Sequence, residues 1–157
     1  MKVKNCMSTN VIVLKPEDNL RTVASLFVSK KLRAAPVVDR EKHVVGIISI
    51  MDILGTFSPD FLPLLRDIDF IKDYGALDIR VKDVKELQKV KVADIMTKNV
   101  ISVKEDSDLM VTIALMRKHG FRHLPVLKDS KLVGIVSYTD LLRRFLEVWE
   151  GKTRGED

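Results

Sequence analysis

Two seven-residue stretches, GIISIMD at Gly46–Asp52 and GIVSYTD at Gly134–Asp140, decide how this 157-residue chain is organised. Both read glycine, two aliphatic residues, serine, two variable residues and aspartate, and they begin 88 positions apart. An apolar run that ends in serine, with an acid three residues later, is typical of a strand that leads into a capped helix. Both stretches therefore predict the same strand–helix junction.

The similarity extends outward from these stretches and defines an internal repeat. At a shift of 89, Met7-Ser8 aligns with Met96-Thr97, and Ala35-Pro36-Val37-Val38 aligns with a stretch that begins Leu124-Pro125-Val126. One residue is then lost in a turn, and ordered matches with a single gap predict two homologous halves. We expect a first repeat at residues 1–56, an apolar helical connector at 57–90, a second repeat at 91–150 and a polar tail at 151–157.

Hydrophobic periodicity predicts the element order β-α-β-β-α in each half. Short apolar runs at Val11–Leu14 and Val100–Val103 predict the first strands. Apolar residues at helical spacing follow, with Asp18 and Ser107 as the expected N-caps. The fold class is therefore α/β, and repeats of roughly 55 residues are small enough that we expect them to pack as a pseudo-two-fold tandem. The later strands are expected at residues 35–39, 44–48, 124–128 and 132–136.

Composition excludes several classes of protein. With 46% hydrophobic and 31% charged residues, the chain can form a core under a solvated surface, which argues against disorder. The single cysteine, Cys6, excludes a disulfide scaffold, and no apolar run approaches the roughly 18 residues of a membrane span. The N-terminus has no signal-peptide pattern, so we expect a cytoplasmic protein.

The distribution of charge argues against nucleic-acid binding, which remains an alternative function. The net charge is +5, but basic residues mostly alternate with acids, and aromatic residues make up 6% of the chain. A nucleic-acid binder usually shows a clustered basic stripe. The nearest approach to one is Arg143-Arg144 with Lys152 and Arg154.

Catalytic and metal-binding motifs are lacking. Three histidines and one cysteine give no HExxH or CxxC spacing, and the seven glycines form neither a P-loop nor GxGxxG. Cys6 has no base nearby in the sequence. Asp52 and Asp140 lie one in each repeat, which favours one site per repeat over a catalytic acid pair. We expect no enzymatic activity, no metal and no catalytic cofactor.

The repeated motifs resemble the CBS domain, and the pair resembles a stand-alone CBS-domain tandem, or Bateman module. The resemblance rests on the Met-Ser/Thr, Pro-Val and Gly-x-x-Ser-x-x-Asp motifs and covers residues 3–56 and 91–147. It implies a regulatory module that binds an adenosyl ligand, such as AMP, ADP, ATP or S-adenosylmethionine, in two clefts between the repeats. It also implies an energy or metabolite sensor that acts on a separate partner protein.

The resemblance also implies ligand-binding residues in both repeats. The aspartate carboxylate would accept hydrogen bonds from the ribose hydroxyls, while helix N–H groups and nearby basic residues favour phosphate. Helix capping alone would explain the same serine and aspartate without a ligand. The implied residues are Ser49, Asp52, Ser137, Thr139, Asp140, Ser102, Val13, Arg33, Arg122 and His123.

The family pattern further implies how the two clefts are composed. It pairs Asp52 with Ser102 and Asp140 with Val13, where many members of the family carry threonine or serine. Thr139 adds a hydroxyl that the first repeat lacks, because Met51 stands at the matching position. We therefore expect the Asp140 cleft to bind more tightly than the Asp52 cleft.

The last helix predicts self-association. Its apolar residues follow helical spacing, and CBS tandems commonly pair through such helices, so we expect a homodimer that also uses the helix near Ile53-Leu54. A core role within one chain is the alternative for this stripe. A further alternative for the whole protein is a structural dimer module that needs no ligand. The stripe consists of Tyr138, Leu141, Leu142, Phe145 and Trp149.

Overall fold

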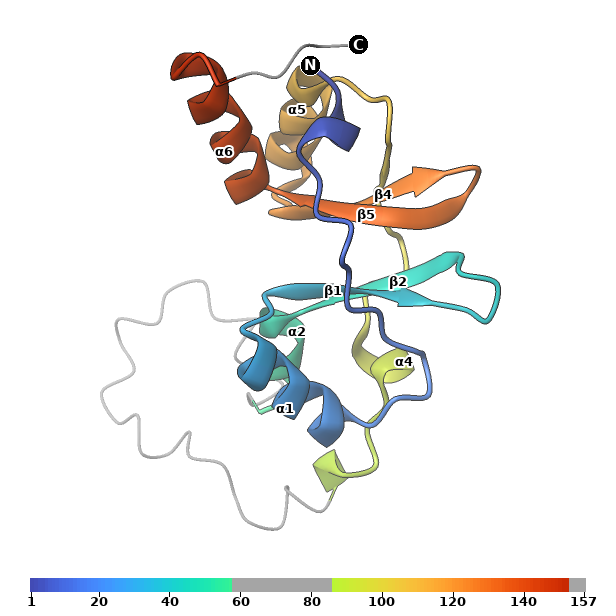
Figure 1. The fold of residues 1–157 in the computed structure, drawn as a ribbon. Helices are drawn as coiled ribbons and strands as arrows, with labels where there is room; N and C mark the ends of the chain where they lie inside the picture. Colours follow the sequence, from blue (N-terminus) through green and yellow to red (C-terminus); the bar gives the residue numbers. More distant parts are fainter. Residues whose placement is uncertain (58–85, 153–157) are drawn as a thin grey trace, which may run out of the picture. The chain divides into compact units, whose positions relative to one another are not determined.

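The computed structural model describes residues 1–57 and 86–152 (Figure 1). The apolar helical connector expected at 57–90 lies almost entirely outside these residues. The described elements are the 3-10 helix η1 (Val3–Asn5), α1 (Leu20–Lys30), β1 (Ala34–Val38), β2 (Val44–Ser49), α2 (Ile50–Gly55), α4 (Val92–Ile95), β3 (Val103–Lys104), α5 (Leu109–His119), β4 (His123–Lys128), β5 (Lys131–Ser137) and α6 (Tyr138–Trp149).

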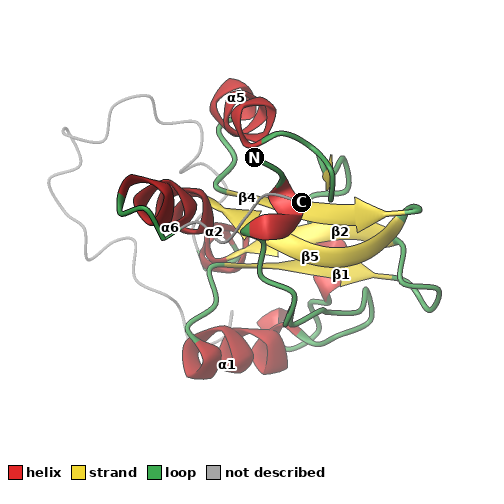
Figure 2. Ribbon diagram, turned by 45° about the horizontal axis from the view of Figure 1, so that its top comes forward, coloured by secondary structure: helices red, strands yellow, loops and turns green. Residues whose placement is uncertain are grey.

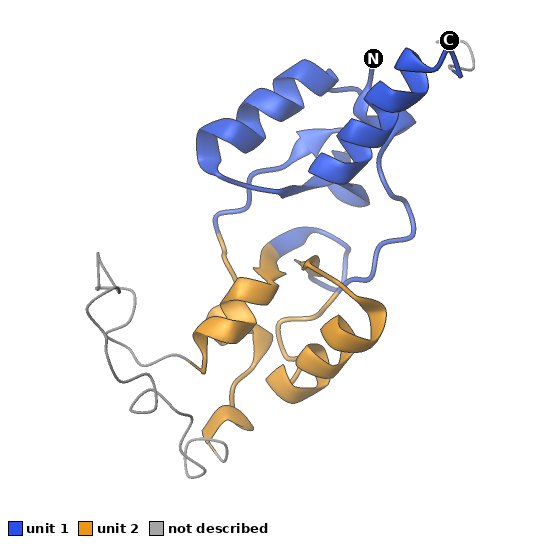
Figure 3. Ribbon diagram, turned by 90° about the vertical axis from the view of Figure 1, so that its left-hand side faces the viewer, with its two compact units in different colours: residues 1–13, 38–45, 99–157 blue, residues 14–37, 46–98 orange. Residues whose placement is uncertain are grey.

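The chain forms two compact units, which are coloured separately in Figure 3. Unit 1 comprises residues 1–13, 38–45 and 99–157, and unit 2 comprises residues 14–37 and 46–98. These units cut across the sequence repeats, because each takes its first segment from one repeat and its main helices from the other. Each unit is therefore described by itself.

The sheet of unit 1 has the strand order β3-β4-β5. β4 and β5 form an antiparallel hairpin in which His123 lies opposite Ser137, with an irregularity at Val126/Leu127. β3 runs parallel to β4. Figure 2 labels β4 and β5 of this sheet. The structure confirms the predicted hairpin to within one residue, but the first strand is Val103–Lys104 and not Val100–Val103.

One hydrophobic cluster forms the core of unit 1. It joins the inner faces of α5 and α6 to the sheet, and η1 contributes Val3, which is fully buried. Leu141 of α6 belongs to this core, so part of the apolar stripe predicted for that helix packs inside the unit. The cluster consists of Val3, Val103, Leu109, Met116, Leu124, Val126, Val136 and Leu141.

Unit 2 repeats this plan with a smaller sheet. β1 and β2 pair as a two-stranded sheet, and α1 buries Leu20, Val23 and Phe27 at the predicted helical spacing. The strand predicted at Val11–Leu14 is wrong in extent, since a single parallel bridge joins Leu14 to Val37. Val92 of α4 is fully buried, as Val3 is in unit 1.

The predicted N-caps of the two long helices are each wrong by one residue. The caps are Asn19 for α1 and Asp108 for α5. The Asp18 carboxylate accepts a hydrogen bond from the Lys15 amide at 2.8 Å, and the Ser107 hydroxyl accepts one from the Lys104 amide at 3.1 Å. These two side chains therefore close the turn before each helix, which is a common use of aspartate and serine.

The first segment of each repeat packs against elements of the other repeat. In unit 1, the Val3 amide donates to the Ser107 carbonyl, and Ser8 exchanges two backbone hydrogen bonds with Ile135. In unit 2, the Val92 amide donates to the Asp18 carbonyl, and Thr97 exchanges the same pair of bonds with Ile47. The exchange is thus the same in both units.

This exchange explains the glycine of each seven-residue motif. A Cβ atom at Gly134 would lie 2.6 Å from the Met7 sulfur and 3.1 Å from the Ser8 carbonyl oxygen. A Cβ atom at Gly46 would collide with the Met96 side chain, which supplies its three nearest atoms. The Met and Gly motifs of the sequence therefore meet across repeats, as a methionine that lies over a glycine.

Candidate functional site

The strand–helix junctions are capping boxes, as predicted. The Ser137 amide and hydroxyl both donate to Asp140 Oδ2, at 2.8 and 2.6 Å, and the Asp140 amide donates to Ser137 Oγ at 3.3 Å. Ser49 and Asp52 form the same three bonds at 2.6, 2.7 and 3.3 Å. Each box fixes one carboxylate oxygen and holds the side chain at the first turn of α6 or α2.

Basic residues predicted to bind phosphate lie beside these helix starts in their own unit. The Ile50 amide of α2 donates to the Arg33 carbonyl at 3.0 Å, and the Tyr138 amide of α6 donates to the Arg122 carbonyl at 3.4 Å. His123 is paired with Ser137 across the β4–β5 ladder. Serine, aspartate and arginine are thus brought together in each unit from separate parts of the sequence.

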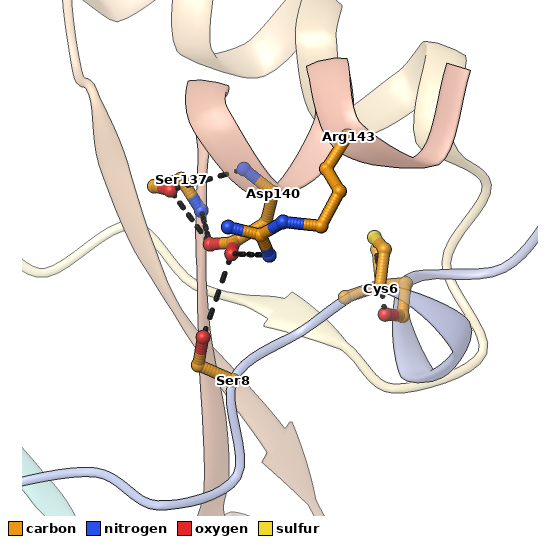
Figure 4. A network of polar contacts seen from close by, with 6 residues as sticks. Cys6, Ser8, Ser137, Asp140 and Arg143 are labelled. Carbon is orange, nitrogen blue, oxygen red and sulfur yellow. Dashed lines mark hydrogen bonds and ion pairs between the residues drawn. The ribbon is translucent and has the colours of Figure 1, made fainter. Parts of the chain in front are cut away.

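The second oxygen of Asp140 is also engaged, by residues that the motif does not contain. Arg143 Nη1 donates to Asp140 Oδ1 at 3.1 Å, and the Ser8 hydroxyl donates to the same oxygen at 3.4 Å (Figure 4). The Asp140 side chain is 8% exposed, whereas that of Arg143 is 59% exposed. The carboxylate is therefore enclosed, and its ion-pair partner lies at the surface.

Asp52 has a simpler environment. Among the described residues, the side chain of Asp52 accepts only the two hydrogen bonds of its capping box, and both go to Oδ2. Gly55 stands where α6 carries Arg143, and Thr97 stands where unit 1 carries Ser8. Within the described part of the chain, the Asp52 Oδ1 atom therefore has no donor that corresponds to Arg143.

Sequence reasoning missed Ser8 and Arg143 as neighbours of Asp140. The sequence could have indicated the contact of Arg143, because an arginine three residues after an aspartate on a helix often forms an ion pair with it. The contact of Ser8 depends on the exchange of first segments, which spacing alone does not reveal. Of the other predicted residues, Val13 and Thr139 are exposed and Ser102 is half-buried. Their shared clefts with Asp140 and Asp52 stay predictions.

Comparison with known proteins identifies the family. A family model described as the CBS domain matches residues 3–58 and 92–147. The chain belongs to the CBS-domain family. The uncharacterized protein MJ1426 of Methanocaldococcus jannaschii is 34% identical over 155 residues, which cover 93% of this chain and 92% of the relative.

Two solved CBS pairs share the fold and were determined with adenosyl ligands. CBSX2, from Arabidopsis thaliana, was determined in complex with AMP and is 25% identical, with a TM-score of 0.72 over 94% of this chain and 98% of that one. The CBS domain pair of MJ0100, in complex with 5-methylthioadenosine and S-adenosyl-L-methionine, is 25% identical, with a TM-score of 0.67 over 92% and 99%. The fold is thus that of an α/β CBS tandem.

The one cysteine of this CBS pair lies near Asp140 (Figure 4). Burial raises the pKa of the Cys6 thiol to about 11, and the negative charge of Asp140 adds to this effect. The thiol donates to the Val3 carbonyl at 3.4 Å. Cys6 is therefore protonated at neutral pH, which makes it a poor nucleophile.

Metal binding and membrane crossing find no support in the described residues. Within these ranges, no three histidine, cysteine, aspartate or glutamate side chains gather as a metal site would require. None of the described helices combines the length and apolar character needed to cross a membrane.

Arg154 of the basic cluster near the C-terminus of the CBS pair lies outside the described residues, and the other three members are paired with acids. Arg143 pairs with Asp140, Arg144 with Glu147 at 3.2 Å, and Lys152 with Glu150 at 2.6 Å. The Arg144 side chain is also buried, at 8% exposure. These contacts weaken the nucleic-acid alternative, because paired cations contribute little to a phosphate-binding stripe.

Proposed function

We propose that this CBS pair is a regulatory module that binds an adenosyl ligand, AMP, ADP, ATP or S-adenosylmethionine. The observation that carries the proposal is the capping box of each unit, in which an aspartate with one fixed oxygen lies at a helix start that is bonded to the carbonyl of Arg33 or Arg122, the residue just before β1 or β4. AMP in CBSX2, and methylthioadenosine with S-adenosylmethionine in MJ0100, support this class of ligand. We expect the ligand to act as a regulator, not as a catalytic cofactor.

The proposed roles follow from the chemistry of each group. Asp52 and Asp140 accept hydrogen bonds from ribose hydroxyls through Oδ1, since Oδ2 is fixed by the cap. Arg33, Arg122 and His123 bind phosphate through their side-chain donors. Ser49 and Ser137 orient the carboxylates, while Ser102, Val13 and Thr139 contact the ligand.

We further propose that the module is a cytoplasmic homodimer that acts as an energy or metabolite sensor on a separate protein. Both α2 and α6 expose large apolar side chains, including Met51 at 69%, Leu142 at 60% and Trp149 at 86% exposure. Exposed apolar patches on helices favour association, and a second copy offers the same two helices. The single cysteine suits a reducing compartment.

A thermal-shift panel with AMP, ADP, ATP, S-adenosylmethionine and NAD tests the ligand proposal. A ligand at about 100 times its Kd should stabilise the folded chain by about 2.7 kcal/mol, so the right ligand produces a clear rise in Tm. Guanosine monophosphate serves as the matched control for phosphate and ribose without adenine. No shift with any adenosyl ligand, together with no heat in calorimetry, would exclude the proposal.

The exposed apolar residues also favour a second candidate function, a dimer module whose role is structural and needs no ligand. Light scattering of the wild type and of Leu142→Asp distinguishes the state of assembly, because an aspartate at this exposed position opposes burial against a second copy. A dimer that binds no adenosyl ligand would favour the structural function. A monomer at micromolar concentration would exclude the homodimer in either function.

A further inference from the structure

The two aspartates of the proposed sites differ in the oxygen that a ribose would use. Asp140 Oδ1 already accepts hydrogen bonds from Arg143 at 3.1 Å and from Ser8 at 3.4 Å (Figure 4). Asp52 Oδ1 has no such donor among the described residues, and Gly55 occupies the position of Arg143. As far as the described residues go, a ligand therefore meets an acceptor that Arg143 and Ser8 already occupy in unit 1, and an acceptor without such donors in unit 2.

The Arg143 guanidinium is placed to respond to a ligand. Its side chain is 59% exposed, while the carboxylate that it contacts is 8% exposed, so the arginine is the partner that can move. Side chains on a helix point back toward its N-terminus, which brings Arg143 to the first turn of α6. A group released from Asp140 at this place lies at the first turn of α6, next to Arg122, whose carbonyl accepts a hydrogen bond from the Tyr138 amide.

We propose that Arg143 makes the Asp140 site selective for phosphorylated adenosyl ligands, whereas the Asp52 site also accepts uncharged ones. This inference rests on the proposed function. An uncharged ribose that takes Asp140 Oδ1 breaks the ion pair and leaves the guanidinium without an anion. A ligand with a phosphate replaces that anion, because a guanidinium binds phosphate through strong charge-assisted hydrogen bonds. Within residues 1–57 and 86–152, Asp52 has no ion pair to break, and Gly55 stands at the position of Arg143.

Calorimetry with adenosine and AMP, on variants that retain one site each, tests this selectivity. An Asp52→Asn background leaves the Asp140 site. In this background, Arg143→Gly should tighten adenosine binding by about 2- to 5-fold, because adenosine no longer has to break a partly exposed ion pair, and this factor corresponds to the free energy of such a pair. The same change should weaken AMP binding by about 10-fold, because it removes a charge-assisted hydrogen bond to the phosphate, and this factor corresponds to the free energy of such a bond. The preference for AMP over adenosine thus falls by more than about 10-fold.

The reciprocal variant provides a matched control. A Cβ atom at Gly55 has no described atom within 4 Å, so the start of a side chain can be added at the end of α2, and Gly55→Arg is the matching substitution. In an Asp140→Asn background, Gly55→Arg should raise the preference of the Asp52 site for AMP over adenosine. A general loss of folding would not lower the AMP-to-adenosine preference in Arg143→Gly and raise it in Gly55→Arg.

The outcomes separate the inference from the proposed function. If the wild type binds AMP but Arg143→Gly leaves the AMP-to-adenosine ratio unchanged, the role of Arg143 is wrong and the ligand proposal stands. If Arg143→Gly weakens both ligands equally, Arg143 acts on the fold of the site and not on selectivity. If the wild type binds neither adenosine nor AMP nor any other adenosyl ligand, the proposed function fails, and the inference fails with it.

Discussion

The junctions at Ser49–Asp52 and Ser137–Asp140 share one backbone geometry, yet their aspartates lie in different environments. Both carboxylates fix Oδ2 through a serine amide and hydroxyl. Only in unit 1, among the described residues, does the other oxygen contact a cation, Arg143. The repeated motif thus fixes the position of the carboxylate, while residues outside the motif determine its partners.

The largest expected effect is on the alkylation rate of Cys6, which depends on the packing around Asp140 in unit 1. Ile95 occupies the matching position of unit 2. Because the pKa of Cys6 is raised from 9.0 to about 11, its thiolate is scarce in the folded chain. Alkylation by iodoacetamide near pH 8 should be about 100-fold slower in the folded than in the urea-unfolded protein.

The same shift has a defined sign for stability. The folded state holds the Cys6 proton more tightly, so this contribution is present below about pH 9 and is lost as the pH rises through about 11. A Cys6→Ser variant should show a smaller decrease in stability over this window. Equal alkylation rates in the folded and unfolded chains would contradict the burial of the thiol beside Asp140.

A second comparison concerns the two motif glycines. Gly134→Ala places a Cβ atom against both the Met7 side chain and, at 3.1 Å, the Ser8 carbonyl, whereas the three atoms nearest to a Cβ atom at Gly46 all belong to the Met96 side chain. A flexible thioether can move but the backbone cannot, so Gly134→Ala should lower the free energy of unfolding by about 1–3 kcal/mol and Gly46→Ala by less.

Urea unfolding measures both losses, and Met7→Ala provides the matched control. Combined with Gly134→Ala, it should recover part of the loss, because the sulfur no longer meets the new methyl group. Full additivity of the two substitutions would contradict the contact between Met7 and Gly134.

A smaller effect is expected at Arg144, where unit 2 has Thr56 at the matching position. The Arg144 side chain is 8% exposed, and its Nε atom is buried without a partner among the described residues. An apolar residue of similar length removes this cost, so Arg144→Met should raise the free energy of unfolding by about 1 kcal/mol. Glu147→Gln should lower it, since it leaves the buried cation unpaired. A loss of stability in Arg144→Met, measured by urea unfolding, would show that the ion pair is net favourable.

What the sequence could predict depended on whether the contact was local. The capping boxes were predictable because Ser137 and Asp140, or Ser49 and Asp52, are three residues apart and the bonds need no distant partner. The hairpins were predictable from apolar runs on either side of polar turns. The ion pair of Arg143 is equally local. It was missed because the comparison of polar groups covered only the residues of the motif, which ends at Asp140.

The exchange of first segments could not be predicted in the same way. Met7 aligns with Met96 and Gly46 with Gly134, and this alignment is equally compatible with contacts within each repeat. The structure places Met7 over Gly134, 127 residues later, because Val3 completes the core around Leu109 and Leu141. Ser8 reaches Asp140 as a consequence of this exchange.

A calorimetric titration of AMP into the wild type, Asp52→Asn and Asp140→Asn tests most directly whether the two capping carboxylates bind the ribose. Asparagine keeps the size of the side chain but removes its charge, so the helix starts are disturbed little. We predict that Asp140→Asn abolishes the tighter phase, in which Arg143 and phosphate contribute, and that Asp52→Asn spares it. Unchanged AMP binding in both variants would contradict a ribose role and leave Asp52 and Asp140 as helix caps.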